Sequence, residues 1–358
     1  MAKHPVRSAA PQLAGVEPYD PKYIPAEVMI SANENPHDVP RKIRDEIEAE
    51  VRGVQLNRYP DPLANDLRDM IAVANGLKRD NIIVGNGGDE LLFNLALAYG
   101  GPGRKLLNIP PTFSVYAYNA MLTNTDVVEI PRNEDFSIRE DEVVARLAQG
   151  DIDFAVITSP NNPTADVASE AFIRRALSAS DTLIMVDEAY FEFSRATVLP
   201  LLAEFDNLVI LRTFSKAYSL AGVRLGYLMA SEGVIDEFKK VRQPYSVDSV
   251  SQAIARAVYR HRDHFEQGAQ AIVAERDRIM PLLAQIDGLE VFPSSSNYVL
   301  VRVKGASEIW GKMLDAGVLV RDFSHSAYLE NCLRISVGAP EENDRMLATL
   351  RALVEGNE

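Results

Sequence analysis

Several features that mark particular protein classes are scarce in this sequence. There is one cysteine, Cys332, so an internal disulfide and a zinc site built from cysteines are both excluded. We expect Cys332 to be a small buried hydrophobic residue. No apolar run approaches the roughly 20 residues needed to span a membrane, and the first residues lack the apolar stretch of a signal peptide. A cytoplasmic protein is therefore expected.

Basic residues are also fewer than acidic ones. Lys and Arg number 37 against 51 for Asp and Glu, which gives a formal net charge of -14. An acidic surface repels nucleic acid and anionic lipid, so neither nucleic acid nor a membrane is predicted as a partner. The five histidines form no convincing metal site. His261 and His264 are one helical turn apart and are expected to face solvent, so we predict no metal.

The length of the chain allows a large domain and a smaller one. Its 358 residues are 47% hydrophobic and 25% charged, which are ordinary globular values. We expect an extended arm over residues 1–30 that is associated with the small domain. A large domain is expected over residues 31–245, and a small domain over residues 246–358.

Short apolar runs alternate with helical patterns through the first part of the chain. This alternation is typical of an α/β fold with a mainly parallel sheet covered by helices. The expected strands there are Ile82–Val84, Lys105–Ile109, Asp126–Ile130, Phe154–Thr158, Leu183–Val186, Leu208–Leu211 and Leu225–Met229. After one long helical stretch, Val250–Leu283, the pattern predicts a smaller α+β unit. Its expected strands are Leu289–Phe292, Asn297–Val303, Val318–Arg321 and Cys332–Val337, with helices over Ala306–Ala316 and Pro340–Val354.

Three segments that follow predicted strands carry residues suited to chemistry. Asp187 ends a buried strand, Lys216 lies among small and hydroxyl residues, and Asn162 lies in a loop with two prolines. Ligands of open α/β sheets bind at this edge of the sheet. Taken singly, each segment has an ordinary interpretation. Asp187 could cap a helix, Lys216 could be a surface lysine, and the loop could be an Asn-Pro turn.

Together, in this order, the three segments resemble the core of the fold-type I aminotransferases that depend on pyridoxal phosphate (PLP). The segments read S-P-N-N-P-T (159–164), V-D-E-A-Y (186–190) and T-F-S-K-A-Y-S-L-A-G-V-R-L-G-Y (213–227). Further motifs are similar to the histidinol-phosphate aminotransferase branch. They are S-A-N-E-N-P (31–36), N-R-Y-P-D-P (57–62), G-N-G-G-D-E (85–90), P-P-T-F-S-V-Y (110–116), V-R-D-F (320–323) and C-L-R-I-S-V-G (332–338).

The resemblance implies a role for each residue around the cofactor ring. Lys216 would bind PLP covalently and later move a proton at the substrate's α-carbon. Asp187 would pair with the pyridine nitrogen. Tyr190 and Asn162 would donate hydrogen bonds to the phenolate oxygen, and Phe113 would stack on the ring.

The resemblance also implies a site for the cofactor's phosphate. The backbone of Gly88 and Asp89 at a helix N-terminus would donate hydrogen bonds. Thr213 and Ser215 would contribute hydroxyls, and Arg224 would contribute a charged guanidinium with several N–H donors. Tyr59 would reach this phosphate from a partner subunit, which implies a homodimer with a shared active site.

For the substrate, the resemblance points to Tyr19, Asn33, Arg321 and Arg334. Two arginines with a tyrosine suit a dianion, so the implied reaction transfers the amino group of L-histidinol phosphate to 2-oxoglutarate in histidine biosynthesis. The chain departs from the branch pattern at His37-Asp38, where Tyr-Gly is usual, and at Ala165, where Gly is usual.

Three alternatives therefore stay open. The first is an aromatic or broad-range amino acid aminotransferase, and the second is a PLP-dependent decarboxylase of a phosphorylated amino acid. The third is a PLP-binding sensor that no longer turns over, although the chain has no DNA-binding segment and its acidic balance opposes one.

Overall fold

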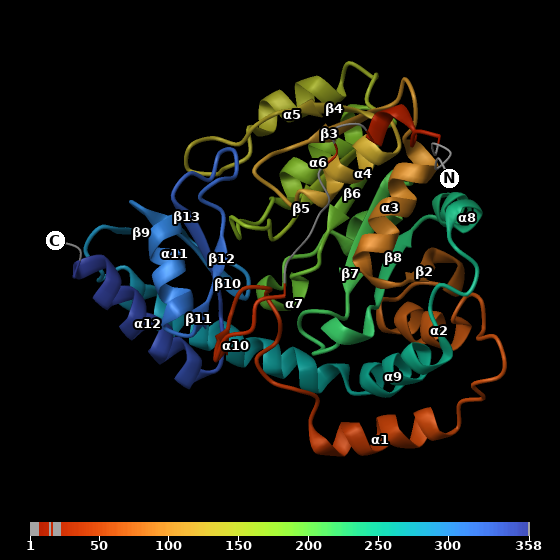
Figure 1. The fold of residues 1–358 in the computed structure, drawn as a ribbon. Helices are drawn as coiled ribbons and strands as arrows, with labels where there is room; N and C mark the ends of the chain where they lie inside the picture. The colour runs from red at the N-terminus through yellow and green to blue at the C-terminus, as the bar shows by residue number, and fades with distance from the viewer. Residues whose placement is uncertain (1–6, 14–15, 17–22, 357–358) are drawn as a thin grey trace, which may run out of the picture.

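The computed structural model describes residues 7–13, 16 and 23–356, and within them a large sheet forms the centre of the molecule (Figure 1). Its seven strands lie in the order β2-β8-β7-β6-β5-β3-β4, and all neighbours pair in parallel except β8, which is antiparallel to β2 and β7. The strands are β2 (Ile82–Gly85), β3 (Lys105–Asn108), β4 (Asp126–Glu129), β5 (Phe154–Thr158), β6 (Leu183–Asp187), β7 (Leu208–Thr213) and β8 (Gly226–Ala230). The predicted α/β fold with a mainly parallel sheet is confirmed.

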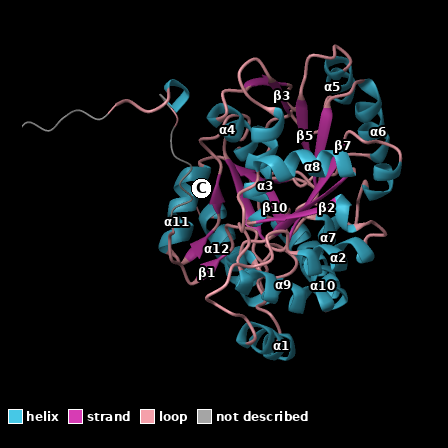
Figure 2. Cartoon of the chain, turned by 90° about the vertical axis from the view of Figure 1, so that its right-hand side faces the viewer, coloured by secondary structure: helices cyan, strands magenta, loops and turns pink. Residues whose placement is uncertain are grey.

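Helices cover both faces of this sheet (Figure 2). The helices of this unit are α1 (Arg41–Arg52), α2 (Asn65–Ala74), α3 (Gly87–Tyr99), α4 (Val115–Leu122), α5 (Glu140–Leu147), α6 (Glu170–Ala179), α7 (Phe191–Ser194), α8 (Glu232–Val241) and α9 (Ser249–Arg260), of which α1 packs on α9 rather than on the sheet. Strands covered on both faces are expected to be apolar throughout, and β5 to β8 are buried along their whole length. Successive residues of β6 alternate between the two faces: Ile184 and Val186 join one core cluster, Leu183 and Met185 the other.

A second unit is built on a four-stranded antiparallel sheet in the order β12-β13-β10-β9. These strands are β9 (Leu289–Val291), β10 (Tyr298–Val303), β12 (Arg321–Asp322) and β13 (Cys332–Ser336). They pack with α10 (Arg262–Leu283), α11 (Ala306–Asp315) and α12 (Pro340–Glu355). Cys332 is fully buried here, next to Leu300 and Phe292.

The expected strand Val318–Arg321 is two strands in different sheets. β11 (Val318–Leu319) pairs in parallel with β1 (Val28–Met29), whereas β12 joins the antiparallel sheet. Between them, the carbonyl of Val320 accepts a hydrogen bond from the indole of Trp310 at 2.9 Å. Because this carbonyl accepts its hydrogen bond from the side chain of a helix residue, the hydrogen bonding between strands is interrupted at Val320.

The long helical stretch expected over Val250–Leu283 is divided at His261, whose backbone (φ -104°, ψ 22°) is not helical. α9 packs against α1 and α2, while α10 contacts α7 of the larger unit as well as β9, β10 and α12. The packing of the larger unit therefore continues beyond residue 245, the expected end of the large domain.

The arm also touches both units: β1 pairs with β11, but the turn Pro11–Leu13 packs against α4.

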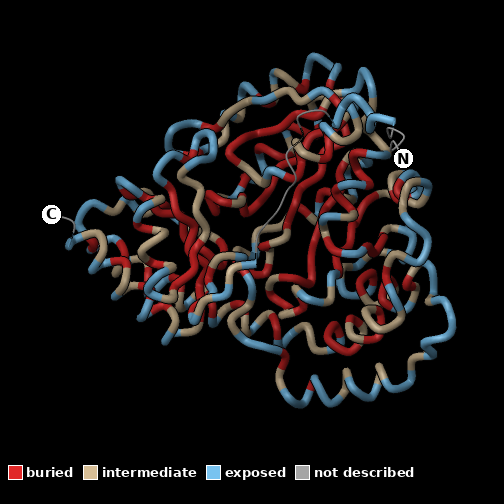
Figure 3. Tube along the Cα trace, viewed as in Figure 1, coloured by how far each residue is buried: buried red, intermediate tan, exposed pale blue. Residues whose placement is uncertain are grey.

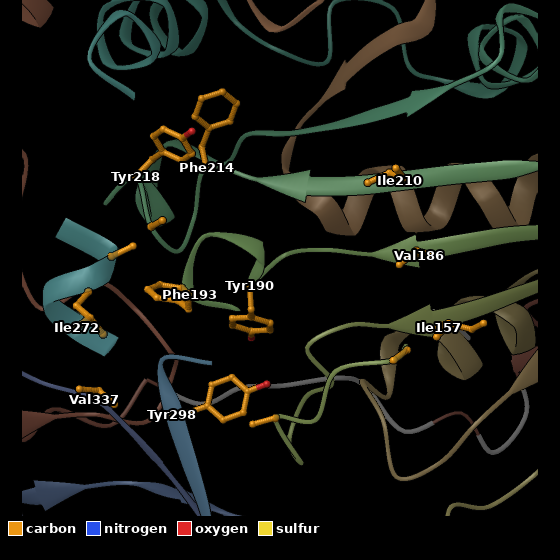
Figure 4. Close-up of a cluster of buried hydrophobic side chains, with 14 of the residues drawn as sticks. Ile157, Val186, Tyr190, Phe193, Ile210, Phe214, Tyr218, Ile272, Tyr298 and Val337 are labelled. Carbon is orange, nitrogen blue, oxygen red and sulfur yellow. The ribbon is translucent and has the colours of Figure 1, made fainter. Parts of the chain in front are cut away.

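The main apolar core runs without a break from the large sheet into the second unit (Figures 3 and 4). Tyr190 lies where the two meet, between the sheet residues Ile157 and Val186 and the second unit's Tyr298. The rings of Tyr190 and Tyr298 are 5.1 Å apart in an edge-on arrangement. This contact is part of the continuous core that joins the second unit to the carboxyl edge of the sheet.

Residues 7–13, 16 and 23–356 contain neither a membrane-spanning helix nor a cluster of metal-binding side chains. No helix there combines the length and apolar character needed to cross a bilayer. No group of three or more His, Cys, Asp and Glu side chains in those ranges could hold a metal ion.

Candidate active site

A pocket of about 840 Å³ opens at the carboxyl ends of β5, β6 and β7 and continues to the second unit. It brings together thirteen of the fifteen residues predicted for the site. They are Asn33, Gly88, Asp89, Phe113, Asn162, Asp187, Tyr190, Thr213, Ser215, Lys216, Arg224, Arg321 and Arg334. Tyr59 lies elsewhere, and Tyr19 falls outside the described residues.

Asp187 is the last residue of β6 and is 4% exposed. Its Oδ1 accepts a hydrogen bond from the backbone N–H of Ala189 at 3.0 Å, and its Oδ2 accepts one from the hydroxyl of Tyr116 at 2.7 Å. Burial raises the pKa of Asp187 to about 6, against the effect of these two donors. The carboxylate is thus held in one orientation in a buried part of the pocket.

Tyr116, on α4, was not among the predicted site residues. It is the last residue of the quoted P-P-T-F-S-V-Y motif, and a buried tyrosine usually finds a hydrogen-bond partner. Sequence alone gave no sign that this partner would be Asp187, which lies 71 positions away.

Lys216 follows β7 and extends its amine into the pocket. Its Nζ donates a hydrogen bond to the carbonyl of Ala32 at 2.9 Å and lies 5.9 Å from the centre of the Tyr190 ring. Burial lowers the pKa of Lys216 to about 8, and the positive charge of Arg334 acts in the same direction. A lysine with a lowered pKa has a larger neutral, nucleophilic fraction near pH 7.

Asn33 is buried between the two units, with a left-handed backbone (φ 56°). Its Nδ2 donates to the hydroxyl of Tyr190 at 2.9 Å, and its Oδ1 accepts from the hydroxyl of Ser336 at 2.9 Å. The Asn33 carbonyl accepts from Asn297. Both ends of the Asn33 side chain are therefore committed to protein partners.

The N-terminus of α3 forms a cradle that is rich in hydrogen-bond donors. Gly87 has φ +79°, and a Cβ there would lie 2.8 Å from Nη2 of Arg224. A Cβ on Gly226 would lie 2.9 Å from the backbone nitrogen of Gly88. Only glycine fits at both positions, so backbone N–H groups remain accessible beside Arg224. Such a helix start suits a phosphate.

The side chains around this cradle add charge and hydroxyls. Arg224 reaches Asp89 at 2.9 Å and the Ser215 hydroxyl at 3.5 Å. The hydroxyl of Thr213 accepts from the Ser215 backbone N–H and donates to the carbonyl of Leu225. Arg224 forms no other ion pair among the described residues, so its guanidinium can turn toward an anion in the cradle.

Arg321 and Arg334 are direct partners across the antiparallel pair β12–β13. Both line the pocket, and the ring of Phe323 lies 5.9 Å and 5.5 Å from their guanidinium carbons. Arg334 is buried; it donates to the carbonyl of Ser31 at 2.6 Å and to Oδ1 of Asn162. Like charges directly opposite each other in a sheet are destabilising, so this arrangement favours an anion between them.

Tyr59 is 81% exposed and stacks on Tyr245, with ring centres 4.6 Å apart. It borders a separate groove between α1 and α9 that also includes Glu50 and Arg256. Within one chain, Tyr59 does not reach the pocket that contains Lys216.

Comparison with known proteins agrees with this geometry. The family model for aminotransferase class I and II matches residues 27–350. A histidinol-phosphate aminotransferase from Chlorobaculum tepidum is 40% identical over 92% of this chain and 94% of its own length. Another, from Carboxydothermus hydrogenoformans, is 40% identical over 94% and 96% of the two chains.

Among solved structures, the histidinol-phosphate aminotransferase of Sinorhizobium meliloti in complex with pyridoxal-5'-phosphate superposes with a TM-score of 0.87. It is 24% identical, and the match covers 98% of each chain. The predicted fold type I is thereby confirmed. By fold, pocket and sequence, this chain belongs to the class I and II aminotransferase family.

Proposed function

We propose that this protein transfers the amino group of L-histidinol phosphate to 2-oxoglutarate with PLP as cofactor. The observation that carries the proposal is the pair Arg321 and Arg334. These two arginines are direct neighbours on the adjacent strands β12 and β13, and both line the pocket. A phosphate ester is a dianion and can neutralise both, whereas a carboxylate can neutralise one. The names of the 40% identical relatives support the same substrate.

The donor set of the pocket fits PLP. An amine with a lowered pKa, a buried carboxylate and a glycine-lined phosphate cradle meet in one pocket. When bound, PLP supplies an electron sink that stabilises negative charge at the substrate's α-carbon. Lys216 would hold the cofactor covalently and, once displaced by the substrate's amine, would take the proton from that α-carbon.

The ring would be held from three sides. Asp187 would keep the pyridine nitrogen protonated through an ion pair. Tyr190 and Asn162 would donate hydrogen bonds to the phenolate oxygen, and Phe113 would stack on the ring. Asn33 would act through Tyr190, because its side-chain amide donates a hydrogen bond to the Tyr190 hydroxyl. We therefore propose that Asn33 positions Tyr190 and does not contact the substrate directly.

The cofactor's phosphate would lie in the cradle at the start of α3. Backbone donors from Gly88 and Asp89, hydroxyls from Thr213 and Ser215, and the charge of Arg224 would hold it. These groups combine the helix N-terminus with charge-assisted hydrogen bonds. Tyr19 remains a proposal for the substrate's phosphate that rests on the sequence resemblance.

We further propose a homodimer with shared active sites, in which Tyr59 reaches the phosphate cradle of the partner subunit. Three large apolar side chains near α1 and α2 support an interface there, because Leu56, Tyr59 and Val73 are each more than 80% exposed. Exposed apolar groups of this size favour a protein contact when they gather on one side.

We also place the boundary between the domains near the junction of α9 and α10.

The test is an absorbance titration of the purified protein with L-histidinol phosphate and no oxo acid. Loss of the visible band of lysine-bound cofactor, with a matching rise in the near-ultraviolet pyridoxamine band, is the expected result. Released carbon dioxide would instead indicate a decarboxylase. A band that responds to aromatic amino acids but not to histidinol phosphate would assign another substrate.

A further inference from the structure

Tyr116 has no part in the proposed function, yet its hydroxyl is buried at the base of the pocket. The residue is 3% exposed, and its Oη lies 2.7 Å from Oδ2 of Asp187 and 2.7 Å from Oγ1 of Thr158. Its ring lies edge-on to Phe113, with centres 5.6 Å apart. One hydroxyl therefore joins the ends of β5 and β6.

The direction of each hydrogen bond follows from counting protons. An ionised carboxylate can only accept, so the single proton of the Tyr116 hydroxyl points to Asp187. Thr158 must then donate its own proton to the Tyr116 oxygen. The neighbouring Thr112 gives its own proton to Oδ1 of Asn161 at 2.7 Å, and its oxygen lies 3.2 Å from Oγ1 of Thr158. The contact between Thr158 and Tyr116 is shorter, at 2.7 Å, so the Thr158 proton is assigned to Tyr116. The resulting chain runs from Thr158 to Tyr116 to Asp187.

The surroundings of Asp187 make this donor important. Burial and the negative charges of Asp89 and Glu188 all favour the protonated form of the Asp187 carboxyl. The hydrogen bond from Tyr116 is the largest opposing influence, followed by the backbone N–H of Ala189. Burial also raises the pKa of Tyr116 well above its ordinary value, so the hydroxyl stays protonated and remains a donor.

We propose that Tyr116 is a positioning residue which, with its proton directed by Thr158, keeps the Asp187 carboxylate ionised and in one orientation. The inference rests on the proposed function, because an ionised Asp187 is what holds the ring nitrogen of PLP protonated. The Tyr116 hydroxyl acts on the carboxylate and need not touch cofactor or substrate.

The test measures the ionisation of Asp187 in the cofactor-free full chain. The carboxyl is followed by ¹³C NMR with labelled aspartate, and its signal is identified by its loss in Asp187→Asn. Tyr116→Phe should raise the proton affinity of Asp187 about tenfold or more, because a hydrogen bond to a charged acceptor is lost. In the holoenzyme with ¹⁵N-labelled PLP, the ring nitrogen should shift toward its unprotonated value.

A second variant keeps the test informative if Tyr116→Phe does not fold. Thr158→Val leaves Tyr116 in place but removes its directing partner, so the Asp187 midpoint should rise by a smaller amount, and Thr158→Ser should restore it. Tyr259→Phe is the matched control, since Tyr259 is also a buried tyrosine but its hydroxyl faces Asn75 at 3.5 Å. It should leave the Asp187 midpoint unchanged.

Unchanged Asp187 titration in Tyr116→Phe, or in Thr158→Val where that is the variant that folds, would overturn the inference. The proposed function fails separately, if the wild-type protein forms no visible band with PLP. The two failures are therefore distinguishable.

Discussion

Glu188 and Arg212 form a buried ion pair directly beside the two strand ends that carry Asp187 and Thr213. Arg212 Nε donates to Glu188 Oε2 at 2.9 Å, and the Arg212 guanidinium lies 3.7 Å over the ring of Phe191. Glu188 also accepts from the Thr197 hydroxyl and the Val198 backbone. Since neighbouring residues in a strand face opposite sides, the ion pair and the pocket residues occupy the two faces of one sheet edge.

This arrangement predicts that Glu188→Ala destabilises the fold strongly. Arg212 would remain buried without its carboxylate, which typically costs about 3–5 kcal/mol. The free energy of unfolding from urea denaturation of the cofactor-free protein measures the loss. Removal of the exposed pair Lys240 and Glu237 should leave stability nearly unchanged. Equal effects of the two changes would show that the buried pair is not important for stability.

Lys216→Ala is expected to abolish transamination and the visible absorbance band, because no other amine is predicted to bind the cofactor. The protein should still fold and retain non-covalent affinity for PLP through the cradle of α3. Equilibrium dialysis and an absorbance spectrum test both points. Lys240→Ala, on the outer surface of α8, serves as the matched control. A visible band in Lys216→Ala would disprove the assignment.

The lowered pKa of Lys216 predicts the pH dependence of cofactor binding. The neutral amine attacks PLP, and its fraction grows as pH rises through about 8. The rate of covalent binding by cofactor-free protein should thus rise about tenfold per pH unit below 8 and level off above it. Stopped-flow absorbance gives the profile.

The same profile has an internal check. Arg334 lowers the pKa of Lys216, so Arg334→Gln should move the midpoint to higher pH. A wild-type rate that still climbs at the ordinary lysine pKa of about 10.4 would contradict the lowered value.

The arginine pair predicts selectivity for a phosphorylated substrate. Arg321→Ala and Arg334→Ala should each raise KM for L-histidinol phosphate about 10- to 100-fold, the usual effect of losing charge-assisted hydrogen bonds. KM for an aromatic amino acid should change less in Arg321→Ala. Arg302→Ala, whose side chain pairs with Glu290 outside the pocket, should behave as wild type. Equal losses on both substrates would argue against a phosphate site.

A mixing experiment tests the shared active site. Tyr59→Ala and Lys216→Ala proteins, each weak or inactive alone, are unfolded together and refolded to form mixed dimers. One site of each mixed dimer would then have Lys216 from one chain and Tyr59 from the other, so activity should recover to about a quarter of wild type for random pairing. No recovery, with dimers present by light scattering, would mean that Tyr59 does not act across the interface.

Much of the fold could be predicted from local pattern. All seven strands of the large sheet lie within one or two residues of the expected ranges. Except for the partly exposed edge strand β4, they are largely buried and read as short, mostly apolar runs. The break at His261 could not be predicted in this way. Both flanking segments have helical patterns, and the break depends on tertiary packing: α9 packs on α1 and α2, whereas α10 passes from α7 to the strands and α12 of the second unit.

The residues of the candidate site also fall into two groups, those that the sequence pointed to and those whose place depends on the tertiary structure. Asp187 and Lys216 stood out from chain order and residue type, since each lies at or just after the carboxyl end of a predicted strand. The role of Arg224, which lies just before β8, came from the family resemblance. The strand that ends in Arg321 was expected to be continuous. Its division into β11 and β12, which aligns Arg321 with Arg334, depends on register between distant strands.

The sequence by itself determined which residues this protein has available for chemistry and on which strand ends they lie, because hydrophobic periodicity and motif order are local properties. Only the tertiary structure decided that Tyr116 donates to Asp187 across 71 positions and that Asn33 donates to Tyr190 across 157. Those contacts depend on how helices and both units pack on the sheet edge. Packing of that kind is set by the whole core and cannot be read from any one segment.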